Sequence, residues 1–185
     1  MSTPNKLTLL RIIMIPAFIA VFYIDFAYNL YVAAALFVLA FITDILDGYL
    51  ARKHNDISNF GKLLDPIADK MLVASALIML TGRDMISPIV AIIILCREFI
   101  ISGIRSFAAA KGKVMPAGIW GKLKTVFQCI AITAMLLGNI GFKEIGIPFD
   151  TIMVVIATAL TVWSGIDYIF ANRDLFKKVV TEDKE

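Results

Sequence analysis

Long apolar segments alternate with short polar connections along the whole chain. Six of these segments are long enough to form a helix that spans lipid, which needs about 20 mostly apolar residues. We expect these helices at residues 7–26, 30–50, 63–80, 86–110, 119–140 and 149–170. Turn-favouring residues such as glycine gather in the connections at 81–84, 138–141 and 146–148. The pattern predicts an all-α integral membrane protein with six transmembrane helices and one membrane domain over residues 1–185.

The composition supports lipid as the solvent of this chain. Hydrophobic residues make up 59% of the sequence, whereas soluble domains contain about 45–50%. The net charge of +3 is too small to indicate a nucleic-acid partner. At the two ends of the chain we expect a short interfacial segment at about residues 1–10 and a polar tail at about residues 172–185.

The charges of the connections predict how the helices are oriented. Six crossings would place both ends of the chain on the same side of the membrane. The connections near 25–30, 81–85 and 139–150 hold two basic and four acidic residues. Most of the 18 lysines and arginines lie on the other side, and positive charge is retained in the cytoplasm. We therefore expect both termini to be cytoplasmic.

Charged residues within the expected helices are unevenly distributed. With this orientation they fall almost entirely in the cytoplasmic halves, whereas outer segments such as 71–80 and 86–96 are almost wholly apolar. A transport path would need polar residues on both sides of the membrane midplane. The distribution predicts an active-site cavity in the cytoplasmic half of the protein.

Four aspartates form the most informative cluster. They are Asp44, Asp47, Asp65 and Asp69. The first two are three residues apart and the last two are four apart, so each pair shares one face of its helix. Ionised carboxylates are costly at membrane depth, and clustered carboxylates suit hard divalent cations. We expect a site for two Mg²⁺ or Mn²⁺ ions; the structural alternative is a set of buried ion pairs with nearby basic residues.

Small residues accompany the aspartates. Gly48 and Ala51 lie one turn beyond the first pair, and Gly61 lies one turn before the second. Small residues let a helix or a flat ligand approach the backbone closely, so helix packing explains them as well as ligand access does. Arg52 follows, where its guanidinium can meet phosphate or carboxylate.

The complete run from Asp44 to Asp69 reads Asp-x2-Asp-Gly-x2-Ala-Arg-x8-Gly-x3-Asp-x3-Asp. It resembles the signature of the CDP-alcohol phosphotransferase family at all eight fixed positions, and six helices with the signature on the second and third also resemble that family. The resemblance implies transfer of a phosphatidyl group from CDP-diacylglycerol to an alcohol, with release of CMP. It further implies that the four aspartates hold two divalent cations and that Asp69 is also the general base. The positions that would hold the cytidine nucleotide are Gly48, Ala51, Arg52 and Gly61.

Basic residues outside the signature bear on the acceptor alcohol. The candidates for binding an acceptor phosphate are Arg105, Lys122, Arg97, Lys62 and Lys124, with Asn5, Thr8 and Arg11 as weaker candidates. This much positive charge suits an acceptor that carries its own phosphate dianion. Segments 4–11, 97–105 and 121–125 are similar to those of bacterial family members that make phosphatidylglycerol phosphate. This resemblance implies sn-glycerol 3-phosphate as the acceptor, a homodimer, and a location in a bacterial cell membrane.

Several alternatives remain open at this stage. Lys124 can be an ordinary cytoplasmic-side charge, Arg97 can pair with Glu98 or an aspartate, and Asn5, Thr8 and Arg11 can simply cap and anchor a helix. The same chemistry could use inositol phosphate, serine or phosphatidylglycerol as the acceptor. A different class of function is a divalent-cation transporter that uses the aspartates as an ion site, although the apolar outer halves argue against it.

Overall fold

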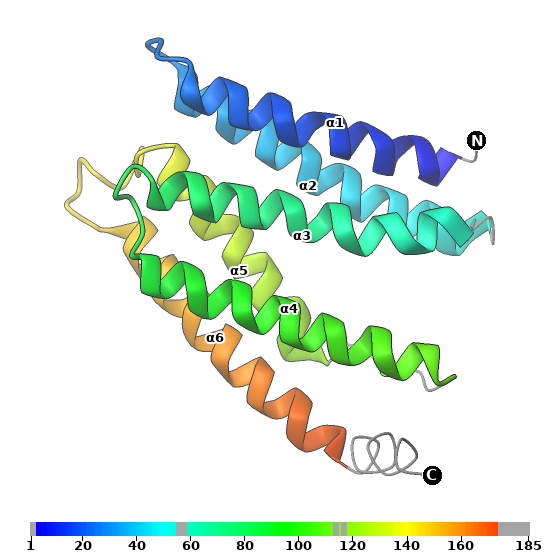
Figure 1. Ribbon diagram of the computed structural model, residues 1–185. Coiled ribbons are helices and arrows are strands. Elements are labelled where there is room, and N and C mark those ends of the chain that lie inside the picture. Colours follow the sequence, from blue (N-terminus) through cyan, green and yellow to red (C-terminus); the bar gives the residue numbers. More distant parts are fainter. Residues whose placement is uncertain (1–2, 55–58, 113–114, 116–117, 174–185) are drawn as a thin grey trace. The chain divides into compact units, whose positions relative to one another are not determined.

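The computed structural model describes residues 3–54, 59–112, 115 and 118–173, and it describes side chains over 9–46, 67–112, 115 and 118–173. This part of the chain contains six helices and no strand (Figure 1). The helices are α1 (Thr3–Tyr23), α2 (Asn29–His54), α3 (Asn59–Thr81), α4 (Pro88–Ala110), α5 (Ile119–Leu136) and α6 (Phe149–Ala171). The all-α prediction and the six expected helices are confirmed.

The helix ends differ from those that hydropathy predicts. At the start of the chain, α1 begins at Thr3, and α2 continues through a polar turn to His54. In contrast, α5 ends at Leu136, where Gly138 and Asn139 both adopt positive φ angles, 61° and 60°. Hydropathy marks where apolar residues stop, whereas backbone hydrogen bonding continues through polar residues and ends where φ changes sign.

Within the described residues, three helices are long and apolar enough to cross a membrane by length and composition. The apolar segments are Asn29–Leu46 in α2, Ile119–Leu136 in α5 and Phe149–Ala171 in α6, and α1 contains a shorter apolar segment, Leu9–Tyr23. Helix α4 is of similar length, but it carries the charged residues Arg97, Glu98 and Arg105. Many large apolar side chains are exposed, which is the pattern expected where lipid replaces water around a protein.

The chain divides into two compact units. Unit 1 contains residues Met1–Ile86 and Ile132–Asp150, and unit 2 contains Ser87–Ala131 and Thr151–Glu185. Each unit therefore combines two separate stretches of sequence. A single membrane domain over residues 1–185 stays a prediction.

In unit 1, α1 packs along α2 and α3. The aromatic side chains of Phe18, Phe22 and Phe37 are buried together, with ring centroids 6.1 Å and 6.3 Å apart around Phe18. Buried Ala33 and Ala34 on α2 leave room for close helix contact. The result is a tightly packed contact between α1 and the first half of α2, ahead of the aspartate run.

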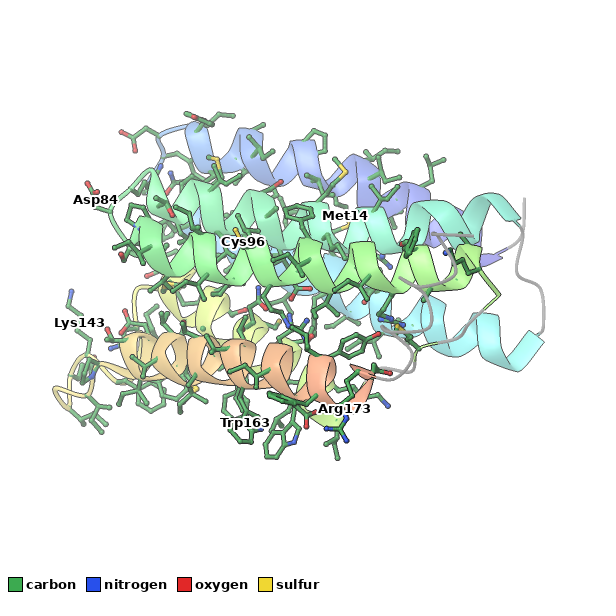
Figure 2. The ribbon with its side chains drawn as sticks, turned by 60° about the horizontal axis from the view of Figure 1, so that its bottom comes forward. Met14, Asp84, Cys96, Lys143, Trp163 and Arg173 are labelled. Carbon is green, nitrogen blue, oxygen red and sulfur yellow. The ribbon has the colours of Figure 1, made fainter. Side chains whose placement is uncertain are left out.

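The connections of unit 1 are held by specific polar contacts. The guanidinium of Arg83 donates to the carbonyl of Phe22 at 2.6 Å and lies 4.5 Å from the centroid of that ring. In the connection before α6, the Asn139 amide donates to the Ile147 carbonyl at 2.7 Å and its oxygen accepts from the Asp150 amide at 3.3 Å. Figure 2 shows the side chains and labels Asp84 and Lys143, which lie in the two connections.

In unit 2, apolar contacts join α4 and α6. Ile101, Ala108, Met115 and Tyr168 form a buried cluster. Trp120 of α5 and Trp163 of α6 meet edge to face, with centroids 6.4 Å apart. Helix α4 begins regularly, with Pro88 in its first turn, where a missing amide hydrogen costs nothing.

Candidate active site

The aspartate run lies on two helices of unit 1. Residues from Asp44 to Arg52 belong to the end of α2, and residues from Gly61 to Asp69 belong to the first half of α3. The expected helical faces therefore exist, and α2 and α3 contact each other. The side chains of Asp47, Gly48, Ala51, Arg52, Gly61, Lys62 and Asp65 lie outside the described part, as do those of Asn5 and Thr8.

Asp44 is paired with an arginine from α1. The guanidinium of Arg11 lies 2.8 Å from the Asp44 carboxylate. The Arg11 side chain is 0% exposed, whereas 27% of the Asp44 side chain remains accessible. A buried guanidinium is stable only when paired and hydrogen-bonded, so this contact fixes Arg11 and orients one face of the carboxylate. The structure thus places Arg11 against an aspartate of the signature.

Asp69 is half-buried on α3, next to the fully buried Ala68. Its neighbours on the same helix face, Leu72 and Ala76, are buried as well. The described side chains contain no group of three or more residues that could hold a metal ion, because two of the four aspartates fall outside them. The donor set fits the expected cations by its chemistry, since carboxylate oxygens are preferred ligands of Mg²⁺ and Mn²⁺.

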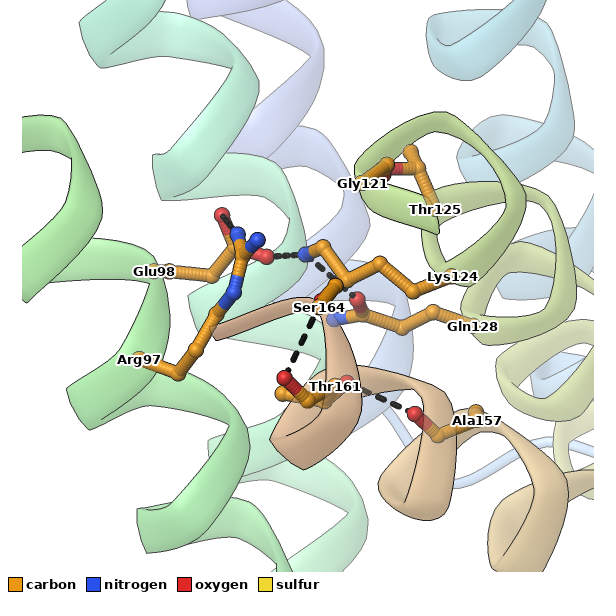
Figure 3. Close-up of polar contacts among 9 residues, drawn as sticks. All are labelled: Arg97, Glu98, Gly121, Lys124, Thr125, Gln128, Ala157, Thr161 and Ser164. Carbon is orange, nitrogen blue, oxygen red and sulfur yellow. Dashed lines mark hydrogen bonds and ion pairs between the residues drawn. The ribbon is translucent and has the colours of Figure 1, made fainter. Parts of the chain in front are cut away.

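A second polar cluster occupies unit 2, where α4 faces α5 (Figure 3). Lys124 forms an ion pair with Glu98, and its ammonium donates to the Gln128 side-chain oxygen at 3.4 Å. A guanidinium nitrogen of Arg97 lies 3.9 Å from the Glu98 carboxylate. Lys124 and Gln128 are each 3% exposed. Two cations therefore share one carboxylate, which leaves this cluster with net positive charge.

Helix α6 approaches this cluster through small residues. A Cβ atom placed on Gly165 would lie 3.3 Å from the Arg97 side chain, closer than ordinary van der Waals contact. The Thr161 hydroxyl donates to the carbonyl of Ala157 at 2.6 Å, and the Ser164 hydroxyl donates to that of Thr161 at 3.0 Å (Figure 3). Because these hydroxyls are satisfied within α6, they shape the surroundings of Arg97 without drawing on its donors.

Arg105 and Lys122 lie in the same unit and differ from Lys124 in exposure. Both side chains are exposed, while Lys124 is buried in its ion pair. Exposed cations keep their donors accessible to an incoming anion. The two residues that the sequence favours most strongly for acceptor phosphate are thus accessible in the structure.

Comparison with known proteins decides the family. A family model described as CDP-alcohol phosphatidyltransferase matches residues 1–163. The chain belongs to the CDP-alcohol phosphatidyltransferase family. The prediction made from the aspartate signature is confirmed.

Three relatives carry the same name, CDP-diacylglycerol–glycerol-3-phosphate 3-phosphatidyltransferase. The protein of Bacillus subtilis is 41% identical, with 95% of this chain and 97% of the relative aligned. That of Rickettsia typhi is 42% identical over 95% and 99% of the two chains. That of Salmonella typhimurium is 40% identical over 93% and 95%. The similarity therefore extends over nearly the full length of both proteins.

The structure of this CDP-alcohol phosphatidyltransferase also reveals polar residues that the sequence reasoning passed over. Gln128 is buried beside Lys124, and Tyr168 is buried in the cluster with Ile101 and Ala108. One signal was available in the sequence: Gln128 follows Lys124 by one helical turn inside an otherwise apolar segment. Tyr168 gave no comparable signal, because tyrosine is common where helices meet the membrane interface.

Proposed function

We propose that this protein transfers the phosphatidyl group of CDP-diacylglycerol to sn-glycerol 3-phosphate, which yields phosphatidylglycerol phosphate and CMP. The single observation that carries the proposal is the intact aspartate run on α2 and α3. Family membership and the names of three relatives aligned over nearly their full length support it. In the reaction, an acceptor hydroxyl oxygen bonds to the phosphorus that carries diacylglycerol, and the bond from that phosphorus to CMP breaks.

The roles of the signature residues follow from their chemistry. Asp44, Asp47, Asp65 and Asp69 would hold two divalent cations, Mg²⁺ or Mn²⁺. Such cations supply neutralisation of the pyrophosphate and of the departing CMP. Asp69 takes the proton of the acceptor hydroxyl as general base. Gly48, Ala51, Arg52 and Gly61 hold the cytidine nucleotide.

Arg11 supports this arrangement from α1. Its guanidinium engages one side of the Asp44 carboxylate at 2.8 Å, while part of that side chain stays accessible. A carboxylate held on one side presents its remaining lone pairs in a fixed direction. Arg11 is therefore a positioning residue for the cation site.

The acceptor phosphate engages basic residues outside the signature. Arg105 and Lys122 are the primary candidates because both are exposed, and Arg97, Lys124 and Lys62 add positive charge. A guanidinium offers a planar pair of donors that matches phosphate oxygens, and an ammonium adds a point charge. This surplus of cations favours a phosphorylated acceptor over serine or another unphosphorylated alcohol.

The membrane arrangement extends what the apolar helices support. We propose that all six helices cross the bilayer of a bacterial cell membrane, with both termini and the active site on the cytoplasmic side. The apolar segments in α2, α5 and α6 favour this arrangement, as does the row of exposed residues Ile89, Ile92, Phe99 and Ile100 on α4. Charge distribution supplies the orientation, and a homodimer is expected from the family.

The test is CMP release by the purified chain in detergent, with CDP-diacylglycerol and a panel of acceptors. We expect release with sn-glycerol 3-phosphate, and weak or no release with inositol phosphate, serine or phosphatidylglycerol. A chelator should abolish the activity, and added Mg²⁺ or Mn²⁺ should restore it. Full activity in chelator would overturn the cation site. Metal uptake into liposomes without CMP release would overturn the enzyme and favour a transporter.

A further inference from the structure

The connection between α5 and α6 exposes several large apolar side chains. We call residues 137–148 the 137–148 loop. Within it, Ile140, Phe142, Ile145 and Ile147 are each between 37% and 64% exposed. Exposed apolar side chains that are grouped together mark a surface that meets lipid or another molecule. The loop is therefore a candidate interaction surface, and it lies apart in the sequence from the aspartate run and from the basic residues of unit 2.

The backbone of this loop is folded on itself. The amide hydrogens of Phe142 and Lys143 both donate to the carbonyl of Asn139, at 3.1 Å and 3.0 Å. The Gly146 amide donates to the Lys143 carbonyl at 3.2 Å, and the Ile147 amide donates to the Phe142 carbonyl at 3.1 Å. Backbone polar groups are costly among lipids unless they are paired. A loop that pairs these groups internally can lie among lipid headgroups more favourably than an open loop.

Side-chain contacts hold the loop against the start of α6. Asn139 adopts a positive φ of 60°, which asparagine tolerates better than most residues. Its side chain bonds both the Ile147 carbonyl and the Asp150 amide. Phe142 stacks on Phe149, the first residue of α6, with ring centroids 4.2 Å apart. The exposed apolar side chains therefore project from a defined structure.

The neighbouring helices indicate what this surface meets. The apolar segment of α5 ends at Leu136, and the apolar segment of α6 begins at Phe149. If both segments cross a bilayer, the 137–148 loop leaves and re-enters lipid on one side and stays close to the headgroups. Lys143 and Glu144, the two charged residues of the loop, are adjacent, exposed and opposite in sign. The loop therefore has no net charge that would oppose contact with the headgroups.

A second connection of unit 1 has a similar surface. Residues 24–28, between α1 and α2, lie at the same end of unit 1 as the 137–148 loop (Figure 1). Phe26 and Tyr28 are exposed there, as is Tyr23 at the end of α1. Tyrosine is enriched where proteins meet the membrane–water interface. One lipid surface accounts for both connections, which favours lipid over a protein partner that covers a single loop.

We propose that the 137–148 loop inserts its exposed apolar side chains into the headgroup region of the adjoining lipid leaflet and anchors this end of unit 1 there. The inference rests on one part of the proposed function, the crossing of α5 and α6, and it is independent of the reaction and of the acceptor. The ligand is the phospholipid surface itself. No particular headgroup is required, because the loop contributes apolar side chains and no net charge. Asn139 is a positioning residue that maintains the fold of the loop.

The test uses a fluorescent label on single cysteines in a chain that carries Cys96→Ala and Cys129→Ala, reconstituted in phosphatidylcholine vesicles. The label at Ile145→Cys should be quenched by a lipid nitroxide near the headgroup and protected from aqueous iodide. Lys143→Cys is the matched control in the same loop. Because charged side chains extend toward water, iodide should quench the Lys143→Cys label at least about threefold more strongly than the Ile145→Cys label. Addition of phosphatidylglycerol should leave both results unchanged.

A label at Val155→Cys, on an exposed position of α6, reports separately on the crossing of that helix. It should be quenched by a nitroxide deeper in the acyl chains. If it is quenched while iodide reaches the Ile145→Cys label freely, the loop lies in water and the inference alone is overturned. Protection of the Ile145→Cys label from both quenchers would mean that a protein surface covers it, which also overturns the inference. An unquenched Val155→Cys label overturns the crossing of α6 and the inference with it, whereas CMP release decides the proposed reaction independently.

Two further measurements test how the loop inserts. Asn139→Gly keeps the positive φ accessible and removes both side-chain hydrogen bonds. In this variant, iodide should quench the Ile145→Cys label at least about twofold more strongly, because the loop opens to water. Unchanged quenching would overturn the positioning role of Asn139. Insertion that appears only with phosphatidylglycerol would assign the contact to the charge of Lys143 and overturn the apolar anchor.

Discussion

The two units of the chain handle buried charge in opposite ways. In unit 1, the guanidinium of Arg11 faces Asp44 at the start of a run rich in carboxylates. In unit 2, Arg97 and Lys124 share the carboxylate of Glu98. In the proposed reaction, the first arrangement would serve cations and the second would serve an anion.

The largest expected effect comes from removing the base of unit 1. Asp69→Asn should lower CMP release by about 10²–10⁴-fold, the contribution typical of general base catalysis. The side chain keeps its size, so folding should be preserved, and thermal unfolding of the purified protein checks this. Asp25→Asn, at an exposed position between α1 and α2, is the control and should retain wild-type activity. Activity of Asp69→Asn above about 10% of wild type would remove Asp69 from this role.

The buried ion pair of unit 2 should govern its stability. Lys124→Met leaves the Glu98 carboxylate without its ammonium, and breaking such a pair costs about 3–5 kcal/mol in unfolding free energy. The double variant Glu98→Gln with Lys124→Met removes both charges and should recover much of this loss. Denaturant titration of the wild type, the single variants Glu98→Gln and Lys124→Met, and the double variant measures the coupling, and exposed Lys143→Met is the control. Additive effects would mean that the pair does not stabilise the unit.

The exposed cations of unit 2 should affect the acceptor more than the donor. Arg105→Ala and Lys122→Ala should each raise the KM for sn-glycerol 3-phosphate by about 10–150-fold, because a hydrogen bond to a charged group is worth about 1.5–3 kcal/mol. Arg105→Lys should recover part of the loss, since lysine lacks the planar pair of donors. Initial rates at varied acceptor and varied CDP-diacylglycerol separate the two effects. If both alanine variants keep the acceptor KM within about twofold, these cations serve only to orient the protein in the membrane.

The smallest effect concerns a contact in the connection between α3 and α4. Arg83→Ala removes the hydrogen bond to the Phe22 carbonyl and the cation–π contact with that ring. Such contacts at exposed sites contribute about 0.5–1 kcal/mol each, so the unfolding free energy should fall by about 1–2 kcal/mol while CMP release stays within twofold. Arg83→Lys should fall between wild type and alanine. A large loss of activity in Arg83→Ala would show that this connection supports the site.

The sequence predicts the helices and the chemistry of unit 1 better than the arrangement of unit 2. Apolar length locates six helices, because the cost of exposing backbone in lipid leaves few other structures. The aspartates are identified by spacing alone, since residues three or four apart on a helix share one face. Their family assignment is confirmed.

Unit 2 was harder to predict because its important contacts join residues far apart in the chain. From the sequence, Lys124 is predicted to be a phosphate ligand or an ordinary cytoplasmic charge. Its ion pair with Glu98 cannot be predicted, because the pair depends on how α4 packs against α5. The burial of the polar atoms of Gln128 and Tyr168 likewise depends on how the helices pack, so the sequence does not reveal it. Gly165 illustrates the same point, because a Cβ atom at this position would lie only 3.3 Å from the Arg97 side chain, and no local sequence pattern reveals this contact.

The contact between Arg11 and Asp44 has a consequence for biosynthesis. An isolated charged side chain near the centre of a helix costs about 2.5–3.5 kcal/mol when the helix is inserted into lipid. Arg11 and Asp44 lie on consecutive helices that pack together, and their charges cancel at 2.8 Å. In the proposed membrane arrangement, helices α1 and α2 would therefore enter the bilayer most favourably as one hairpin, after the ribosome has completed both. The first step of assembly would then depend on a pair whose acidic member, Asp44, also belongs to the signature.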